Sequence, residues 1–320
     1  MNFPLNAVQS PPDSRDFVFS QEGETPTTFD MRPSLLPVRN QGAQGSCFAM
    51  STACMKEYQE RKDYGLKEYL SPQFFYDQRF NLYDARGDND EGMYGRDVMT
   101  LLSKVGICTE QEYPYGTPQD RTDVTTDIYE SASKHRVAGY AAVRTLNALK
   151  KSLVDNGPCL IGFPVYHYGE YMWKPEYEGQ PMSGGHAMTV VGYTEDSFII
   201  RNSWGDRWGD GGYCYYPFED WGAHWELWTT IDADTVIERQ VESEDEPEDD
   251  VEPEVEDEPE AEDEVEDDVE PEAEDEDEVN PDPDVNRPHE RRWWRAIAYL
   301  FAGCITYLCL SRQTYKSPEK

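Results

Sequence analysis

Apolar residues first recur along the chain with a helical period. Between residues 47 and 58 they fall at i, i+3, i+4, i+7, i+8 and i+11, which predicts a helix with one buried face. Ser46 stands at the position of an N-cap. Because Glu57 precedes Arg61 by four residues, we expect an ion pair on the solvent side of this helix.

The period changes later in the chain. Helices are also expected over residues 95–105 and 145–156, and short apolar runs bounded by turn residues then follow, which are typical of strands. The expected strands are CLIGFPV (159–165), AMTVVGY (187–193), SFIIRNSW (197–204), GYCYYPF (212–218) and ELWTTID (226–232). Helices followed by strands predict an α+β fold in two lobes.

Charge divides the chain into unlike parts. The net charge is -37, and residues 241–285 hold 28 Asp and Glu with no Lys or Arg. The expected segments are an extended N-terminal leader (1–30), a globular domain (31–238), an acidic spacer (239–286), and a basic-flanked hydrophobic segment with a tail (287–320). Since the globular domain is itself acidic, we expect no nucleic-acid partner.

The acidic spacer repeats itself. EDDVEPE occurs at 248–254 and again at 266–272, a period of 18 residues. A segment of Glu, Asp, Val and Pro buries too little apolar surface to fold, so we expect a disordered tether that its own charge extends. A second hypothesis is that the spacer binds basic proteins electrostatically.

A hydrophobic segment follows the spacer. Residues 296–311 contain no charged side chain and, as a helix rising about 1.5 Å per residue, extend roughly 24 Å. This is short for a hydrocarbon core of about 30 Å, but Trp293, Trp294 and Tyr307 suit the two membrane interfaces. We expect a membrane anchor through residues 293–311. The alternative is a hydrophobic helix that docks onto a protein partner.

Nothing at the N-terminus resembles a secretory signal. The sequence MNFPLNAVQSPPDSRDF has neither a basic start nor a long apolar run. We therefore expect a protein that is not secreted, with a single-pass C-terminal anchor and its globular domain in the cytosol. The odd number of cysteines in that domain fits thiols in a reducing compartment better than disulfides.

One cysteine differs from the others in its position. Cys47 begins the first predicted helix, directly after the Gly-rich turn NQGAQGS, where the positive end of a helix dipole stabilises a thiolate. A nucleophilic cysteine also needs a base. Four histidines are expected at the surface or in packed aromatic loops: His135, His167, His224 and His289. His186 is the remaining candidate.

His186 lies in a predicted hairpin, GGHAMTVVGYTEDSFIIRNSWG. With a four-residue turn, Tyr193 faces Phe198, and His186 and Asn202 reach the same end of the ribbon about three residues out of step, roughly 10 Å. Contact between them needs a bulge or a shifted turn. An Asn carbonyl fixes an imidazole tautomer without adding a charge. A buried hairpin with polar ends by chance would have the same pattern.

Three stretches together resemble the papain-like cysteine peptidases: QGAQGSCFAMS, SGGHAMTVVGY and RNSWGDRWGDGGYCYYP. His186 follows Cys47 by 139 residues, within the roughly 130 to 150 of that family, and Asn202 follows it by 155, slightly beyond. The resemblance implies a helical lobe with Cys47, a β-barrel-like lobe with His186 and Asn202, and a substrate cleft between them. The short leader resembles that of bacterial and viral members.

The resemblance also implies roles for individual residues. Cys47 attacks the scissile carbonyl as a thiolate, His186 protonates the leaving amine, and Asn202 holds His186. Trp204 shields that hydrogen bond from water, and Gln41 donates to the oxyanion together with the backbone N–H of Cys47. Core packing is the alternative interpretation of Trp204, and a turn is that of Gln41.

For the substrate, the stretch EGMYG resembles the glycine-containing segment whose backbone pairs with an extended peptide. Gly92 and Met93 would bind substrate there, and Ala187 would line the pocket for the side chain two residues before the cut. A plain loop glycine is the alternative interpretation of Gly92. The sequence departs from the family at Gln44, which replaces a usual cysteine, and at Phe48, which replaces an aromatic Trp or Tyr.

We therefore expect a membrane-tethered cysteine endopeptidase that acts on polypeptides and requires neither a cofactor nor a metal. Two alternatives stay open. The first is a catalytically idle papain-like module that recruits basic proteins through the acidic spacer. The second is a transferase with the same Cys–His chemistry.

Overall fold

The structure is a computed structural model that describes residues 3–21, 23–79, 92–116 and 124–231. These residues belong to one unit of the chain, Met1–Glu244. The predicted acidic spacer and hydrophobic segment lie outside them. Within the described ranges, no helix is both long and apolar enough to cross a membrane.

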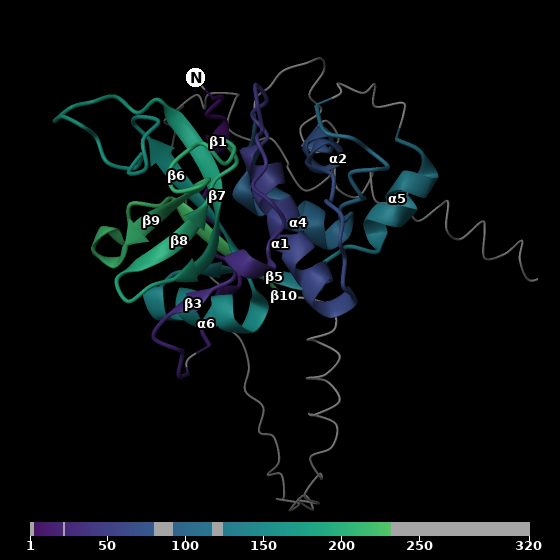
Figure 1. The fold of residues 1–320 in the computed structure, drawn as a ribbon, viewed down its shortest axis with the longest axis horizontal. Helices are drawn as coiled ribbons and strands as arrows, with labels where there is room; N and C mark the ends of the chain where they lie inside the picture. The colour runs from purple at the N-terminus through teal and green to yellow at the C-terminus, as the bar shows by residue number, and fades with distance from the viewer. Residues whose placement is uncertain (1–2, 22, 80–91, 117–123, 232–320) are drawn as a thin grey trace, which may run out of the picture. The chain divides into compact units, whose positions relative to one another are not determined.

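Helices gather on one side of this unit and strands on the other, as the predicted α+β fold requires (Figure 1). The helices of the first lobe are α1 (Cys47–Tyr64), α2 (Pro72–Asp77), α4 (Gly95–Lys104) and α5 (Thr126–Ser133). Helix α4 matches the prediction for residues 95–105. Helix α6 (Leu146–Asn156) packs against the sheet instead, and the Thr145 hydroxyl caps it by accepting the N–H of Ala148 at 3.2 Å.

Helix α1 is buried on nearly every side, which differs from the predicted single face. Its polar residues Lys56 and Glu60 are as inaccessible as its apolar ones, at 1% and 4% exposure. The reason is tertiary packing, since the sheet covers one side of α1 and the helices α2 and α4 cover others. Glu57 consequently pairs with Arg39 at 2.9 Å and not on the solvent side with Arg61.

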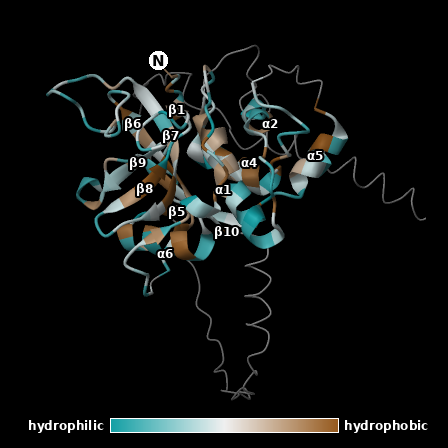
Figure 2. Cartoon of the chain, viewed as in Figure 1, coloured by the Kyte–Doolittle hydropathy of each residue, from teal (hydrophilic) through white to brown (hydrophobic). Residues whose placement is uncertain are grey.

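The second lobe is built on an eight-stranded sheet with the order β2-β5-β10-β6-β7-β8-β9, and β3 pairs with β7. The strands are β2 (Val18–Phe19), β3 (Phe29–Asp30), β5 (Gly139–Val143), β6 (Cys159–Val165), β7 (Gly184–Tyr193), β8 (Ser197–Arg201), β9 (Tyr213–Pro217) and β10 (Glu226–Ile231). Five of them lie where the apolar runs predicted strands. Figure 2 shows hydrophobic residues along the inner strands and hydrophilic residues in the surrounding loops.

The β7–β8 hairpin has the predicted turn. It also has a bulge, which the sequence analysis required for contact between His186 and Asn202. Tyr193 pairs with Phe198, and the register shifts between Val190 and Gly192. This bulge reduces the offset between the positions of His186 and Asn202 by one residue. Strand β8 ends at residue 201, so the backbone beyond it is free to turn toward β7.

Residues of the predicted N-terminal leader pair with strands of the folded domain. Strand β1 (Ala7–Val8) pairs in parallel with β4 (Met93–Tyr94), and β2 pairs in parallel with β5. Ala7 and Phe19 are buried, at 6% and 7% exposure. The sequence prediction missed this because an isolated two-residue strand has almost no periodicity to detect.

Candidate active site

Cys47 is the first residue of α1, with Ser46 at the N-cap position. The hydroxyl of Ser46 does not cap the helix but bonds to the hydroxyl of Tyr115 at 2.6 Å. Helix α1 packs along β7, and Cys47 shares a buried cluster with Ala187, the residue after His186. The structure therefore brings the helix that starts with the thiol against the strand that carries the imidazole.

The remaining cysteines of the described residues are buried thiols with little nucleophilic character. Burial raises the pKa of Cys54, Cys108 and Cys214, and it raises the pKa of Cys159 to about 11. A thiol with a raised pKa carries little thiolate at neutral pH. None of these four begins a helix, so Cys47 remains the candidate nucleophile.

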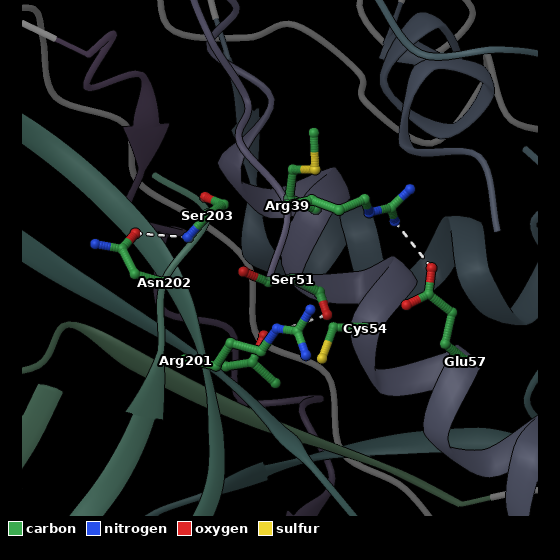
Figure 3. A pocket seen from close by; sticks show the side chains of 9 residues that line it. Arg39, Ser51, Cys54, Glu57, Arg201, Asn202 and Ser203 are labelled. Atoms are coloured by element: carbon green, nitrogen blue, oxygen red, sulfur yellow. Dashed lines mark hydrogen bonds and ion pairs between the residues drawn. The ribbon is translucent and has the colours of Figure 1, made fainter. Parts of the chain in front are cut away.

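His186 and Asn202 form the hydrogen bond that the sequence could not place. His186 Nε2 lies 2.7 Å from Asn202 Oδ1, and both side chains are buried. The same oxygen accepts the backbone N–H of Ser203 at 2.7 Å, as Figure 3 shows. An oxygen that accepts both bonds requires the hydrogen of the neutral imidazole to be on Nε2. Nδ1 is then the proton acceptor, and no described residue forms a hydrogen bond to it.

Burial determines the charge of His186. It lowers the pKa of the imidazole to about 4, while the hydrogen bond that Asn202 Oδ1 accepts from the ring opposes this shift. Because an imidazole is neutral above its pKa, His186 is neutral at pH 7 in this structure. A neutral ring with its hydrogen on Nε2 is in the correct form to take a proton at Nδ1.

Trp204 covers the His186 ring. The ring centroids are 4.4 Å apart with an interplanar angle of 25°, and Trp204 is 3% exposed. The bulge explains the position, because extending the shifted register beyond the end of β8 places residue 204 opposite residue 186. In this position the Trp204 side chain shields the His186–Asn202 hydrogen bond from water.

Gln41 is buried, and both the oxygen and the nitrogen of its side-chain amide form hydrogen bonds. Its Oε1 accepts the hydroxyl of Ser203 at 2.6 Å, and its Nε2 donates to the carbonyl oxygen of Gln44 at 2.9 Å. An amide nitrogen has two hydrogens, so one remains for a further acceptor. The backbone N–H of Gln41 also bonds to the Ser203 carbonyl at 2.8 Å. The sequence analysis missed Ser203, whose only signal is its position directly after Asn202.

A small polar cavity lies between α1 and the end of β8 (Figure 3). Its volume is about 10 Å³, room for about one water molecule. Arg39 is paired with Glu57 on one wall, and Arg201 donates to the carbonyl oxygens of Leu36 and Pro37 at 2.6 and 2.7 Å on the other. These bonds tie α1 and the preceding loop to the strand end that presents Asn202.

Among the residues that the structure describes, no three His, Cys, Asp or Glu side chains come together in a way that could hold a metal ion. Of the two guanidinium groups in the wall of the polar cavity, that of Arg39 pairs with Glu57, and that of Arg201 donates to backbone carbonyl oxygens.

The predicted substrate residues lie beneath the chain's own N-terminus. Residues 3–10, which we call the N-terminal segment, run between β4 and β7. At Gly92 the φ angle is +76°, and a Cβ there would overlap the carbonyl oxygen of Asn6. Ala7 packs in one cluster with Met93 and Ala187. All three predicted substrate residues therefore lie next to the N-terminal segment.

Further contacts hold the N-terminal segment over the candidate catalytic residues. Phe3 stacks on Trp204 with centroids 4.8 Å apart and an interplanar angle of 3°. The carbonyl oxygen of Leu5 accepts the N–H of Gly185 at 3.2 Å, directly before His186. The segment pairs in parallel with β4 on one side and with β7, at Gly185, on the other. A stretch of the chain itself thus lies between β4 and the strand that carries His186.

Comparison with known proteins agrees with this architecture. The model of the papain family of cysteine proteases matches residues 25–220. An uncharacterized peptidase C1-like protein of Acanthamoeba polyphaga mimivirus is 26% identical over 250 residues, which cover 66% of this chain and 80% of that protein. Cathepsin K of Mus musculus is 32% identical over 234 residues, which cover 66% of this chain and 67% of cathepsin K.

A solved structure shows the same fold. Xylellain, a cysteine protease from Xylella fastidiosa, superposes with a TM-score of 0.62 at 26% identity, covering 72% of this chain and 96% of that one. The matched residues 25–220 make up more than half of the chain and include Cys47, His186 and Asn202. The chain therefore belongs to the papain family of cysteine proteases.

Proposed function

We propose that this papain-like cysteine peptidase cuts internal bonds of polypeptides, with Cys47 as nucleophile and His186 as its base and acid. The observation that carries the proposal is the 2.7 Å hydrogen bond between His186 and Asn202, buried beneath Trp204. It leaves Nδ1 as the atom that exchanges a proton with sulfur. Helix α1, which Cys47 begins, packs against the same strand.

The chemistry proceeds in two halves. Cys47 Sγ attacks the scissile carbonyl carbon, and its proton passes to His186 Nδ1 and then to the leaving amine as the C–N bond breaks. A thioester remains on Cys47. Water next attacks this thioester, His186 takes the water proton, and the sulfur recovers it as the carboxylic acid product leaves. Asn202 keeps the imidazole oriented through both halves.

Gln41 stabilises the oxyanion in this proposal. Its Nε2 has one hydrogen left after the bond to Gln44, and Ser203 prevents the amide from rotating. The backbone N–H of Cys47 supplies the second donor. Removing one such donor typically costs about 3 to 4 kcal/mol of transition-state stabilisation.

The proposal includes a location. Residues 293–311 anchor the protein in a membrane, and the peptidase domain faces the cytosol. The uncharged stretch 296–311, flanked by two tryptophans and by arginines, supports this. An idle module that binds basic proteins is the competing function, and the presence of a complete Cys47–His186–Asn202 set argues against it.

An epoxide-type cysteine-peptidase inhibitor should form a single adduct, on Cys47, when it reacts with the folded, reduced full-length chain. Activation by the imidazole should make this reaction at least tenfold faster than that of His186→Ala. Peptide mapping by mass spectrometry locates the adduct, and Cys54→Ala is the matched control that should label normally. Absence of any adduct on folded protein would favour the idle binding module.

The rate of Cys47 alkylation by iodoacetamide should fall as the pH falls through about 4. Above that pH the Cys47–His186 pair holds one proton, which can reside on the imidazole and leave a thiolate. Below it, both groups are protonated, so the sulfur stays a thiol. Mass spectrometry at a series of pH values measures the rate. In His186→Gln the fall should begin at much higher pH, below the ordinary thiol pKa of about 8.5, because no imidazole takes the proton. A wild-type rate that is independent of pH in the acid range would contradict the assignment.

Replacing Phe3 by Ala should increase the rate at which the inhibitor labels Cys47 several-fold. The N-terminal segment occupies the cleft, and the lost ring stack on Trp204 contributes about 1 kcal/mol to its docking. Phe17→Ala is the matched control, because Phe17 is 80% exposed. Equal rates for the two variants would show that the segment does not limit access.

The full-length chain should float with zwitterionic lipid vesicles in a density gradient, in low and in high salt alike. Insertion of an uncharged helix into lipid does not depend on salt, whereas electrostatic binding through the acidic spacer would weaken in high salt. Leu300→Arg combined with Leu308→Arg should abolish flotation, because two charges within a membrane helix are costly. A wild-type chain that stays at the bottom of the gradient would exclude the anchor.

A further inference from the structure

The loop directly before Cys47 carries one of the proposed oxyanion donors and leads to the other. Gln41 contributes its side-chain amide, and Cys47 contributes its backbone N–H. Residues 41–46 belong to no helix or strand, and the backbone bond from the N–H of Gln44 to the carbonyl oxygen of Gln41 is long, at 3.5 Å. Because the loop has no regular backbone structure, its side-chain contacts help to determine where the donors lie.

Gln44 connects this loop to helix α2. Its carbonyl oxygen accepts the Nε2–H of Gln41 at 2.9 Å, and its own side-chain Nε2 donates to Oε1 of Gln73 at 2.9 Å. Gln73 lies within α2 and is 3% exposed. With its backbone Gln44 therefore holds the amide of Gln41, and with its side chain it is itself held to a buried helix.

The amide of Gln73 has a fixed orientation. Its Nε2 donates to Asp77 Oδ1 at 3.0 Å, and Asp77 Oδ2 accepts the hydroxyl of Tyr113 at 3.0 Å. An amide that uses its nitrogen as donor and its oxygen as acceptor cannot rotate without breaking both bonds. The acceptor that Gln73 offers to Gln44 is therefore held in place by the core of the helical lobe.

A second contact ties the same loop to Gln73. The hydroxyl of Tyr115 donates to the carbonyl oxygen of Gln41 at 2.7 Å, and the next residue, Gly116, donates its N–H to Gln73 Oε1 at 3.2 Å. This contact holds the backbone of Gln41. The bond through Gln44 differs because it ends on the side-chain amide, which is the group that donates to the oxyanion.

The bond between Gln44 and Gln73 is a property of this chain and does not follow from its family. The family usually has a cysteine at the position of Gln44. A thiol is a weak hydrogen-bond donor on a shorter side chain, so it would not replace this amide bond. The proposed mechanism has so far given the bond no role.

The geometry of an oxyanion hole tolerates little displacement. Its donors act at about 2.7–3.1 Å from the oxyanion, and a misplacement of about 1 Å can lower a rate about 100-fold. Ser203 holds the oxygen of the Gln41 amide, and the carbonyl of Gln44 holds its nitrogen. A shift of Gln44 would therefore turn the hydrogen that Gln41 keeps for the oxyanion.

We propose that Gln44 is a positioning residue of the oxyanion hole, and that its bond to Gln73 fixes the carbonyl that orients the Gln41 amide. This inference rests on the proposed peptidase function. Gln41 stabilises charge that exists only in the transition state. Loss of its orientation should therefore lower kcat and leave KM nearly unchanged.

The test uses the full-length chain with fluorescein-labelled casein as substrate. Gln44→Met keeps the length of the side chain and the backbone carbonyl but removes the donor to Gln73. We expect kcat to fall about tenfold with KM within about twofold of wild type. Gln73→Met removes the acceptor of the same bond and should lower kcat by at least as much. The two losses should not add in the double variant, because either substitution breaks the one bond.

A second double variant tests whether Gln44 acts through Gln41. Gln41→Ala should lower kcat by about 100-fold or more, because a whole donor is lost. Gln44→Met should then lower kcat less than about threefold further in the Gln41→Ala background, because no amide remains to be oriented. A purely structural role of Gln44 would give losses that multiply.

Gln59→Met is the matched control. Gln59 is likewise a buried glutamine, and its Nε2 donates to Thr230 Oγ1 at 2.9 Å and to the carbonyl oxygen of Asn156 at 3.2 Å. It lies towards the other end of α1 from Cys47. The substitution should lower Tm about as much as Gln44→Met does, while kcat stays within about twofold of wild type.

Alkylation of Cys47 by iodoacetamide gives a readout that does not use the oxyanion hole. Iodide leaves a saturated carbon as sulfur attacks it, so no carbonyl oxygen gains charge. Gln44→Met should therefore keep the wild-type alkylation rate and its pH dependence while kcat falls. Slowed alkylation would show that the substitution disturbs the Cys47–His186 pair and would overturn the positioning role.

The outcomes separate the two proposals. If casein is not hydrolysed, or if hydrolysis survives Cys47→Ala, the peptidase assignment and the role of Gln44 both fail. Hydrolysis that depends on Cys47 but has the wild-type kcat in Gln44→Met would overturn the role of Gln44 alone. Full multiplication of the losses from Gln44→Met and Gln41→Ala would do the same.

Discussion

Helix α1 lies against β7, and this contact holds the two lobes of the site together. The helix is buried by the sheet on one side and by α2 and α4 on others, so even Lys56 and Glu60 are inaccessible. Burial of that extent prevents the helix from sliding or rotating, since charged groups would lose their partners. The position of Cys47 at its first residue is therefore a consequence of core packing, and the chemistry depends on it.

The β7–β8 hairpin supplies the matching constraint on the other lobe. A single bulge and the early end of β8 bring Asn202 to His186 and place Trp204 over the ring. Burial of this pair lowers the pKa of the imidazole and keeps it neutral, which is the form that takes a proton from sulfur. The residues that exclude water from the His186–Asn202 pair therefore also determine the protonation state of His186.

The N-terminal segment covers the candidate active site. It runs from the ring of Phe3, which stacks on Trp204, to the backbone N–H of Ser10, which donates to Glu226. It therefore covers residues that we propose bind a substrate polypeptide.

The sequence by itself determined the α+β class, most of the strands, the helices α4 and α6, and the identity of the candidate catalytic residues. Periodicity, turn residues and the three stretches around Cys47, His186 and Asn202 are local signals, so they can be read without coordinates. Only the tertiary structure decided the hairpin offset, the all-round burial of α1, the pairing of Glu57 with Arg39, and the position of the N-terminal segment. Each of these depends on contacts between residues far apart in the chain, and no local pattern encodes them.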